Sequence, residues 1–155
     1  MAKPVDNIEF WKERIQTAPV EHYSVFVTDE KEWRHIEETH KKIIGEHING
    51  SVLDAGCGYG RASEWFSEYL GIDFSPDFIL KAKEKYPNKS FEVQDLKNLP
   101  YPDQSFDWAF CISIKRMIQD NLGLEVWNKM EQELKRVAKK VLILEYGECE
   151  KYEIL

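Results

Sequence analysis

Short apolar segments alternate with amphipathic segments along most of this chain. The apolar segments predict five strands, at residues 51–55, from Gly71, and at 90–94, 107–112 and 141–146. Apolar residues at helical spacing predict helices at about 61–69, 76–86 and 123–139. Strands that alternate with helices indicate parallel pairing, because each parallel connection needs a crossover. We therefore expect an α/β fold with a doubly wound, mostly parallel five-stranded sheet in the order 3-2-1-4-5 and helices on both faces.

About fifty residues precede this alternating region. Ile8 to about Gln16 predicts a short amphipathic helix, and Thr17 to Thr28 is a connecting segment. Asp29 can begin a longer helix, with Glu32 as its capping-box partner three residues on. We expect a single domain over 1–155, made of an N-terminal helical cover (1–50), an α/β core (51–146) and a tail (147–155).

Composition excludes several kinds of partner. The chain has 155 residues, 43% of them hydrophobic, which is enough for a real core. The formal charge of −7 would repel phosphate backbones, so no nucleic-acid partner is expected. There is no signal peptide and no apolar run of about 18 residues, so we expect no membrane span. Three cysteines without paired spacing suggest reduced thiols in the cytoplasm, and four histidines without ligand spacing predict no metal site.

A glycine-rich turn follows the first predicted strand. Val52 to Gly60 reads VLDAGCGYG, with glycines at 56, 58 and 60. Glycine allows a tight turn and lets a ligand lie directly against the backbone. The helix predicted from Arg61 would present unpaired N–H groups to that ligand. A nucleotide-like ligand is therefore indicated.

The spacing of the glycines and the acid before them narrow the choice of ligand. A dinucleotide fingerprint reads G-x-G-x-x-G, but here the third glycine comes one place early. The carboxylate of Asp54 would oppose a pyrophosphate and favour a cationic ligand. S-adenosyl-L-methionine (SAM) fits, because it carries a sulfonium and an ammonium and no phosphate. A nicotinamide-dependent oxidoreductase is the less favoured alternative.

Two further acids follow the second and third predicted strands. The spacing from the first glycine to Asp73 is close to the spacing of about 20 residues that is typical of a ribose-binding acid. Ser75 can cap the next helix, and Pro76 suits its first position. Asp95 ends the third strand. The carboxyl ends of parallel strands share one edge of a sheet, so the glycine turn and the three acids are expected to converge at the switch point between strands 1 and 4.

Taken together, LDAGCGYGR, GIDFSP and the Asp-Leu pair followed by LPYPDQSFD resemble the class I, Rossmann-like SAM-dependent methyltransferases. The resemblance runs from about Val52 to Tyr146. It implies SAM as cofactor and S-adenosyl-L-homocysteine (SAH) as product. It also implies that the backbone of the loop at Gly56, Cys57 and Gly58 lies beside the methionine part of SAM.

The same resemblance implies roles for residues after the later strands. Asp73 would bind the ribose hydroxyls, with Phe74 against the adenine. Asp95 would accept a hydrogen bond from the adenine amino group, and the backbone N–H of Leu96 would donate one. Cys111, at the end of the fourth strand, would face the methionine end of the cofactor.

The chain departs from this family after the fifth strand. The usual sixth and seventh strands are expected to be lacking, which would leave strand five as an exposed hydrophobic edge. A homodimer through that edge could cover it, and the alternative is that the tail at 147–155 folds back over it.

The acceptor side is less well marked than the cofactor side. Its candidates are chosen by position only and are His22, Tyr23, Lys115 or Arg116, Glu145 and Tyr146. No Asn/Asp-Pro-Pro-Tyr/Phe follows the fourth strand, which weighs against a nucleic-acid or amide acceptor. We expect methyl transfer to a small-molecule acceptor. The alternative is a SAM-binding, non-catalytic or regulatory subunit that completes a partner.

Overall fold

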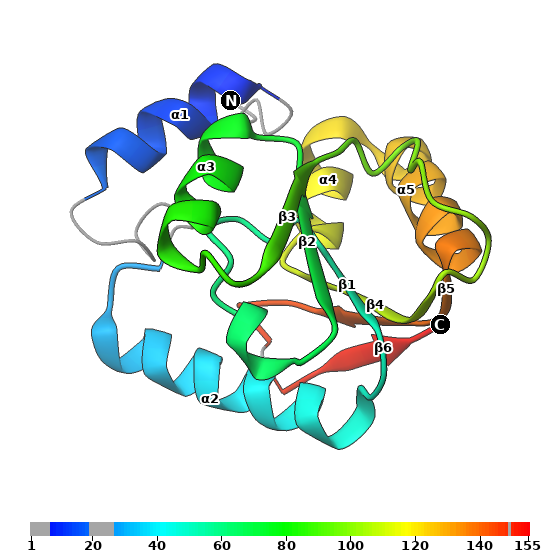
Figure 1. The fold of residues 1–155 in the computed structure, drawn as a ribbon. Coiled ribbons are helices and arrows are strands. Elements are labelled where there is room, and N and C mark those ends of the chain that lie inside the picture. The colour runs from blue at the N-terminus through cyan, green and yellow to red at the C-terminus, as the bar shows by residue number, and fades with distance from the viewer. Residues whose placement is uncertain (1–6, 19–26, 149) are drawn as a thin grey trace.

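The computed structural model describes residues 7–18, 27–148 and 150–155. In these ranges it has one six-stranded sheet, ordered β3-β2-β1-β4-β5-β6, with β6 antiparallel to β5 and the other neighbouring pairs parallel (Figure 1). The elements in chain order are α1 (Ile8–Thr17), α2 (Glu30–His47), β1 (Val52–Ala55), the 3-10 turn η2 (Ser63–Trp65), β2 (Tyr69–Asp73), α3 (Pro76–Lys85), β3 (Ser90–Val93), β4 (Phe106–Ile112), α4 (Lys115–Leu122), α5 (Leu124–Val137), β5 (Ala138–Leu144) and β6 (Tyr152–Ile154). The predicted parallel α/β sheet and its order 3-2-1-4-5 are confirmed.

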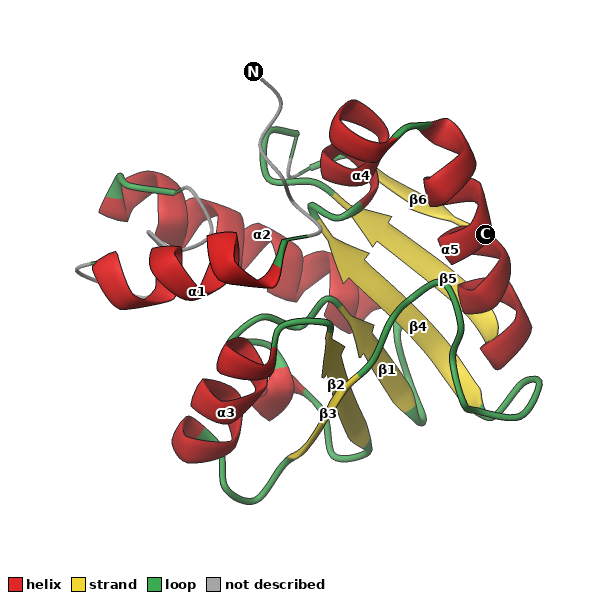
Figure 2. Ribbon diagram, turned by 90° about the horizontal axis from the view of Figure 1, so that it is seen from above, coloured by secondary structure: helices red, strands yellow, loops and turns green. Residues whose placement is uncertain are grey.

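Helices cover both faces of the sheet, as Figure 2 shows from above. On one face, alternate strand residues such as Phe110 and Leu142 pack against Ile44 of α2. On the other face, Leu53 and its strand neighbours pack with Trp127 of α5. Strands that are apolar on both sides fit this arrangement, because each face of the sheet has its own helical cover.

Several helix boundaries follow the predicted capping chemistry. Asp29 Oδ1 accepts from the backbone N–H of Glu32 at 2.7 Å at the start of α2. Ser75 Oγ accepts from the N–H of Phe78 at 3.3 Å, and Pro76 takes the first position of α3. These caps satisfy donors that a helix start leaves unpaired. They also place α3 directly after Asp73, which brings that acid to the end of its strand.

The helix predicted at 61–69 is wrong. The connection contains only the 3-10 turn at Ser63–Trp65, and β2 already begins at Tyr69. A helix over the predicted range would leave no residues for the return to the sheet. Trp65 and Phe66 instead pack against the cluster formed by α2, β1, β4 and β5. The glycine turn is therefore followed by a tight crossover rather than by the N-terminus of a helix.

The prediction that strand five forms an open edge is also wrong. Residues of the tail form β6, which pairs antiparallel with β5 so that Leu142 faces Ile154 and Leu144 faces Tyr152. Tyr152 also hydrogen bonds to His47 at the end of α2, with 3.0 Å between Nε2 and the hydroxyl oxygen. The folded-back tail, which was the alternative, is what covers β5. A homodimer is therefore not needed to cover β5, and the dimer itself stays a prediction.

The loop between β3 and β4 is held by one arginine of α5. Arg136 donates from Nη2 to the carbonyl of Leu99 at 2.9 Å and from Nη1 to the carbonyl of Tyr101 at 2.8 Å. Glu133 accepts from Arg136 Nε at 2.8 Å and from the backbone N–H of Leu99 at 2.8 Å. A guanidinium suits this task because its five donors lie in a fixed fork. These hydrogen bonds from Arg136 and Glu133 hold the loop that begins at Asp95.

Candidate functional site

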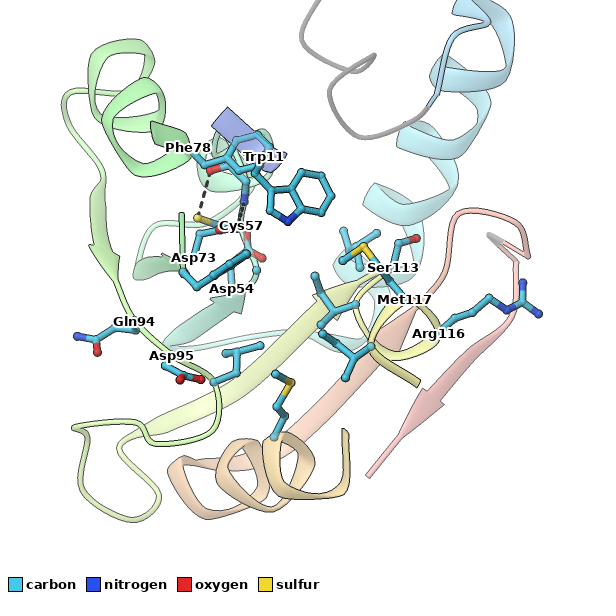
Figure 3. Close-up of a pocket in the computed structure, with 18 of the residues that line it drawn as sticks. Trp11, Asp54, Cys57, Asp73, Phe78, Gln94, Asp95, Ser113, Arg116 and Met117 are labelled. Carbon is cyan, nitrogen blue, oxygen red and sulfur yellow. Dashed lines mark hydrogen bonds between the residues drawn. The ribbon is translucent and has the colours of Figure 1, made fainter. Parts of the chain in front are cut away.

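A cavity of about 740 Å³ lies at the carboxyl ends of the strands. Figure 3 shows Asp54 and Asp73 close together below Trp11, with Asp95 on one side and Ser113 and Met117 on the other. The cavity lies where the strand order reverses between β1 and β4, which is where open α/β sheets bind ligands. Its lining includes residues of the glycine turn, of the segments after β2, β3, β4 and β5, and of α1, α4 and α5.

The glycine turn forms the floor of the cavity through its backbone. The N–H groups of Gly56 and Cys57 both donate to the carbonyl of Ile72, at 2.8 and 2.9 Å, which folds the turn onto β2. Gly58 has φ +55°, in the left-handed region that favours glycine. A Cβ added there would meet only the Phe78 ring, at 3.9 Å, so the space above Gly58 is open. The backbone at Gly58 is therefore exposed to the cavity, with no side chain of its own in between.

Asp73 is tied into the turn by its carboxylate. Its Oδ2 accepts from the N–H of Gly58 at 3.0 Å, and its Oδ1 accepts from the N–H of Ser75 at 3.0 Å. Burial raises the pKa of Asp73 to about 6, although hydrogen bonds from Ser75 and Gly58 oppose this rise. A carboxylate oxygen can accept more than one hydrogen bond, so both oxygens keep acceptor capacity.

Asp54 lies beside Asp73 and is almost fully buried at the end of β1. Its Oδ2 accepts from the hydroxyl of Tyr69, with 2.6 Å between the oxygens. Burial raises the pKa of Asp54 to about 7, while the Tyr69 hydroxyl and the charge of Arg61 lower it. A buried acid with a pKa near neutrality is typical of functional sites, because burial without full charge compensation is costly to stability.

Residues expected to contact the adenine also line the cavity. Phe74, Asp95 and Leu96 all belong to its lining. Asp95 Oδ1 accepts from the backbone N–H of Lys97 at 2.9 Å, and its Oδ2 lies 3.5 Å from Lys97 Nζ. The structure thus brings the second and third acids to one cavity, as the sequence predicted. Their assignment to ribose and adenine stays a prediction.

The two cysteines named from the sequence differ in position. Cys57 lines the cavity, and its Sγ donates to the carbonyl of Gly58 at 3.5 Å. Burial and the neighbouring carboxylates of Asp54 and Asp73 raise the pKa of this thiol, so it stays protonated. Cys111 is fully buried in the core and is not part of the cavity lining. Ile112 and the two residues after it line the part of the cavity wall at which Cys111 was expected to face the cofactor.

The acceptor-side candidates are scattered. His22 and Tyr23 lie outside the described residues. Lys115 is not in the lining and forms an ion pair with Glu153 of β6. Tyr146 lines the cavity and stacks on His40, with 5.9 Å between ring centroids. Arg116 also belongs to the lining, although its side chain extends away from Trp11 and Asp73 (Figure 3).

Glu145, the last of these candidates, lines the cavity next to Tyr146. Its Oε1 accepts from the N–H of Arg116 at 3.0 Å, near the start of α4, which has no cap of its own. Burial raises the pKa of Glu145. The carboxylate therefore serves as a helix cap in this structure.

Several cavity residues have no counterpart in the sequence prediction. Trp11 of α1 covers the cavity and packs on Phe78 of α3, with 5.8 Å between ring centroids. Met117 lines the opposite wall, and Arg61 lines the end near Tyr146. Amphipathic spacing indicated that Trp11 would be on a helix, but no local signal tells which surface that helix covers.

Within the described ranges, no group of three potential ligands could hold a metal ion. The same part of the chain contains no helix long and apolar enough to cross a membrane.

Comparisons with known proteins agree with this architecture. Among curated relatives, phosphatidylethanolamine N-methyltransferase of Cereibacter sphaeroides is 26% identical over 117 residues, covering 68% of this chain and 55% of the relative. Norajmaline N-methyltransferase of Rauvolfia serpentina is 33% identical over 111 residues, covering 63% of this chain and 36% of the relative. The chain thus spans about half, or less, of the length of these two relatives.

Solved structures share the fold. A Pyrococcus horikoshii protein superposes with a TM-score of 0.69 at 27% identity, covering 86% of this chain and 65% of that chain. Phosphoethanolamine N-methyltransferase 1 of Haemonchus contortus, in complex with phosphoethanolamine and SAH, gives a TM-score of 0.69 at 19% identity and covers 90% of this chain and 32% of that chain. The second likeness shows the fold alone.

The family assignment rests on the match to a protein family. Residues 52–140, more than half of the chain, match the family described as methyltransferase domain. This range contains the glycine turn, all three acids and β1 to the start of β5. The chain belongs to the methyltransferase domain family and has the class I, Rossmann-like fold of the SAM-dependent methyltransferases.

Proposed function

We propose that this chain is a SAM-dependent methyltransferase that transfers a methyl group to a small-molecule acceptor. One observation carries the proposal. A single cavity joins the bare backbone at Gly58 to the buried carboxylates of Asp54 and Asp73. This combination offers close backbone approach and negative charge together, which suits a cationic nucleoside and not a pyrophosphate.

The residues present fit SAM. The open space above Gly58 would be filled by a side chain at any other residue, so the glycine leaves room for a ligand. Asp54 would hold the ammonium group, Asp73 the ribose hydroxyls, and Phe74 and Leu96 the adenine, with Asp95 at its edge. When bound, SAM supplies an activated methyl group on a sulfonium. The chain's own task is alignment, because holding two reactants in attack geometry can supply about 7–11 kcal/mol of the barrier.

Three features support a small-molecule acceptor. The cavity volume of about 740 Å³ is within the range of small-molecule sites and extends past the glycine turn to Tyr146 and Gly147. Relatives are named as N-methyltransferases of phosphatidylethanolamine and of norajmaline. The apolar wall at Ile114, Met117 and Ile118 can pack the non-reacting part of such an acceptor.

The direct test is formation of SAH from SAM. The purified chain is incubated with SAM and a fractionated metabolite extract, and SAH is measured by mass spectrometry. We expect SAH to accumulate with at least one fraction and the acceptor mass to rise by one methylene. A Gly58→Ala chain in the same extract is the control for contaminating enzymes. SAH formation equal in both samples would contradict the proposal.

A second function is favoured by a different observation. Three of the described candidates for acceptor chemistry have structural partners, since Lys115 pairs with Glu153, Glu145 caps α4, and Tyr146 packs with Trp33 and His40. This arrangement is consistent with a SAM-binding subunit that completes a partner. Such a chain would bind SAM and form no SAH with any fraction of the extract.

The affinity for the cofactor is expected to depend on pH. A ligand ammonium favours the ionised carboxylate of Asp54, whose pKa is about 7 in the free protein. Affinity is therefore low when this group is protonated and rises as pH increases through 7. We expect SAH to bind about fivefold more tightly at pH 7.5 than at pH 6.0, measured by calorimetry. Asp54→Asn should flatten this dependence, and an affinity that falls with rising pH would contradict it.

A further inference from the structure

Glu145 lies at the end of the cavity where β4 and β5 both end. Glu145 and Ser113 line this end together, from the segments after β5 and β4. The segment at Ser113 and Ile114 adjoins the glycine turn, because a Cβ added to Gly56 would lie 2.5 Å from Cδ1 of Ile114. A molecule held at Ser113 and Glu145 would therefore be next to a cofactor held against the turn.

Ser113 has a strained backbone at the junction of the two strands. Its φ of +57° lies in the left-handed region, which costs a residue with a Cβ roughly 1–2 kcal/mol. The Ser113 N–H donates to the carbonyl of Leu144 at 2.8 Å, and Ser113 Oγ accepts from the Tyr146 N–H at 2.7 Å. The same conformation brings the hydroxyl to the Glu145 carboxylate, whose pKa it lowers. Strain of this kind is concentrated at functional sites, where the surrounding structure holds a side chain in one position.

The Glu145 carboxylate keeps acceptor capacity after its structural contacts are made. Its two oxygens offer about four acceptor sites. In the described part of the chain, the N–H of Arg116 at 3.0 Å and the hydroxyl of Ser113 use two of them. The cap of α4 therefore holds the carboxylate in place without saturating it.

The negative charge of Glu145 is only partly compensated. Among the described residues it forms no ion pair, since Lys115 pairs with Glu153 and the exposed Arg116 side chain extends away from the glycine turn (Figure 3). Burial, the largest effect, raises the pKa of Glu145, while contacts and charges from Arg116 and Lys115 lower it. His40 faces the Glu145 carbonyl at 3.4 Å and is neutral, because burial lowers its pKa to about 4. Such a carboxylate attracts a cation and can accept a proton.

The pKa of the acceptor group decides which nucleophile this carboxylate can serve. An aliphatic ammonium has a pKa near that of lysine, about 10.4, whereas a hydroxyl holds its proton nearly as strongly as water, at about 15.7. A carboxylate accepts the first proton far more easily than the second. A thiol or a phenol, at about 8.5 and 10, would become an anion that the carboxylate repels. Of these groups, only the ammonium is both attracted and able to give up its proton here.

We propose that the methyl acceptor is an amine, and that Glu145 binds its ammonium group and takes one proton from it. This inference rests on the proposed function, because it requires methyl transfer in this cavity. The proton passes to a Glu145 oxygen, which leaves a lone pair on nitrogen. The nitrogen then forms a bond to the methyl carbon while the bond from that carbon to sulfur breaks, and the electron pair of the broken bond stays on sulfur in SAH. The product leaves as a methylated ammonium, and Glu145 releases its proton to water. Glu145 is the catalytic residue of this step, and Ser113 is a positioning residue.

The test follows a labelled methyl group into the acceptor. The chain is incubated with SAM that carries a deuterated methyl group, and with a metabolite extract divided on a strong cation exchanger at acidic pH, which retains amines. We expect SAH to form with the retained fraction only, and fragmentation in mass spectrometry to place the label on nitrogen. A label on oxygen, sulfur or carbon, or SAH formed from the unretained fraction, would overturn the inference and leave the proposed function standing. SAH formation with neither fraction contradicts both.

Glu145→Gln tests the residue itself, because glutamine keeps an oxygen to cap α4 and loses the charge and the proton acceptor. We expect SAH formation with the retained fraction to slow by at least about a hundredfold, and the calorimetric affinity for SAH to change less than about twofold. Ser113→Ala should slow the reaction about tenfold with the same unchanged affinity. Glu148→Gln is the matched control, since Glu148 pairs with Lys151 outside the cavity lining, and both measurements should stay at wild-type values.

Two results would overturn the role of Glu145. One is a wild-type rate in Glu145→Gln, and the other is an equal loss of rate and of SAH affinity, which would make the residue structural only. If Glu145→Gln does not fold, the position of the label in the wild-type product still decides whether the acceptor is an amine.

Discussion

Asp73→Ala is expected to weaken SAH binding by about a hundredfold, and by at least tenfold. A hydrogen bond to a charged group contributes about 1.5–3 kcal/mol, and the carboxylate is proposed to accept from two ribose hydroxyls. The side chain also accepts from the N–H groups of Gly58 and Ser75, so the substitution removes an anchor of the glycine turn. Both losses act in the same direction. Isothermal calorimetry at pH 7.5 measures the effect.

Two further variants separate binding from folding. Asp73→Asn keeps an acceptor oxygen and should give an intermediate loss, because the charge is removed while the shape is kept. Asp77→Asn removes a carboxylate from the first turn of α3, outside the cavity lining, and should leave the affinity unchanged. Thermal unfolding shows which variants are folded at the titration temperature. A folded Asp73→Ala chain with wild-type affinity would remove Asp73 from the binding site.

Gly58→Ala is expected to weaken SAH binding about thirtyfold. The new Cβ would occupy the open space in which the ligand is proposed to contact the Gly58 backbone. Overpacking of this kind costs about 1–3 kcal/mol. The left-handed φ of +55° adds a strain of roughly 1–2 kcal/mol, which lowers stability in the free and bound states alike. Calorimetry therefore reports the steric part, and thermal unfolding reports the strain.

Gly123→Ala is the matched control for the strain. Gly123 has φ +97° between α4 and α5, and a Cβ added there meets nothing within 4 Å. This variant should lose stability and bind SAH normally. If Gly58→Ala bound SAH as tightly as Gly123→Ala, the ligand would not lie against the glycine turn.

Much of the sheet could be predicted from local pattern. Runs such as 108–112 are apolar without interruption, which in a chain of alternating strands and helices indicates a strand buried on both faces. Ser75 and Pro76 marked the start of α3 through capping chemistry that depends on neighbouring residues only. Because the acids at 54, 73 and 95 each lie at or just after the carboxyl end of a parallel strand, the pattern also predicted that they meet at one edge.

The errors in the fold arose where tertiary contacts override local preference. Arg61 to Tyr69 contains residues compatible with a helix, but the crossover to β2 is too short for one, and packing of Trp65 and Phe66 decides its shape. The tail has little strand pattern, and β6 forms because β5 offers unpaired backbone groups beside it. Neither effect can be read from spacing along the chain.

The site was predictable only in part for the same reason. The glycine turn and its acids form a local motif, whereas the wall opposite them is assembled from distant segments. Trp11 reaches the cavity from α1, and His40 reaches Arg61 from α2. The aromatic rings around the Arg61 guanidinium come from positions that are far apart in sequence, 33, 65 and 146. Such contacts require the fold before they can be seen.

A crystal structure of the chain grown with SAH tests the central claim most directly. The account predicts the adenosyl group inside the cavity, with both ribose hydroxyls within hydrogen-bond distance of the Asp73 carboxylate and the homocysteine part against the backbone of Gly58. Density for SAH at another surface, or a cavity closed by the chain's own side chains, would contradict it.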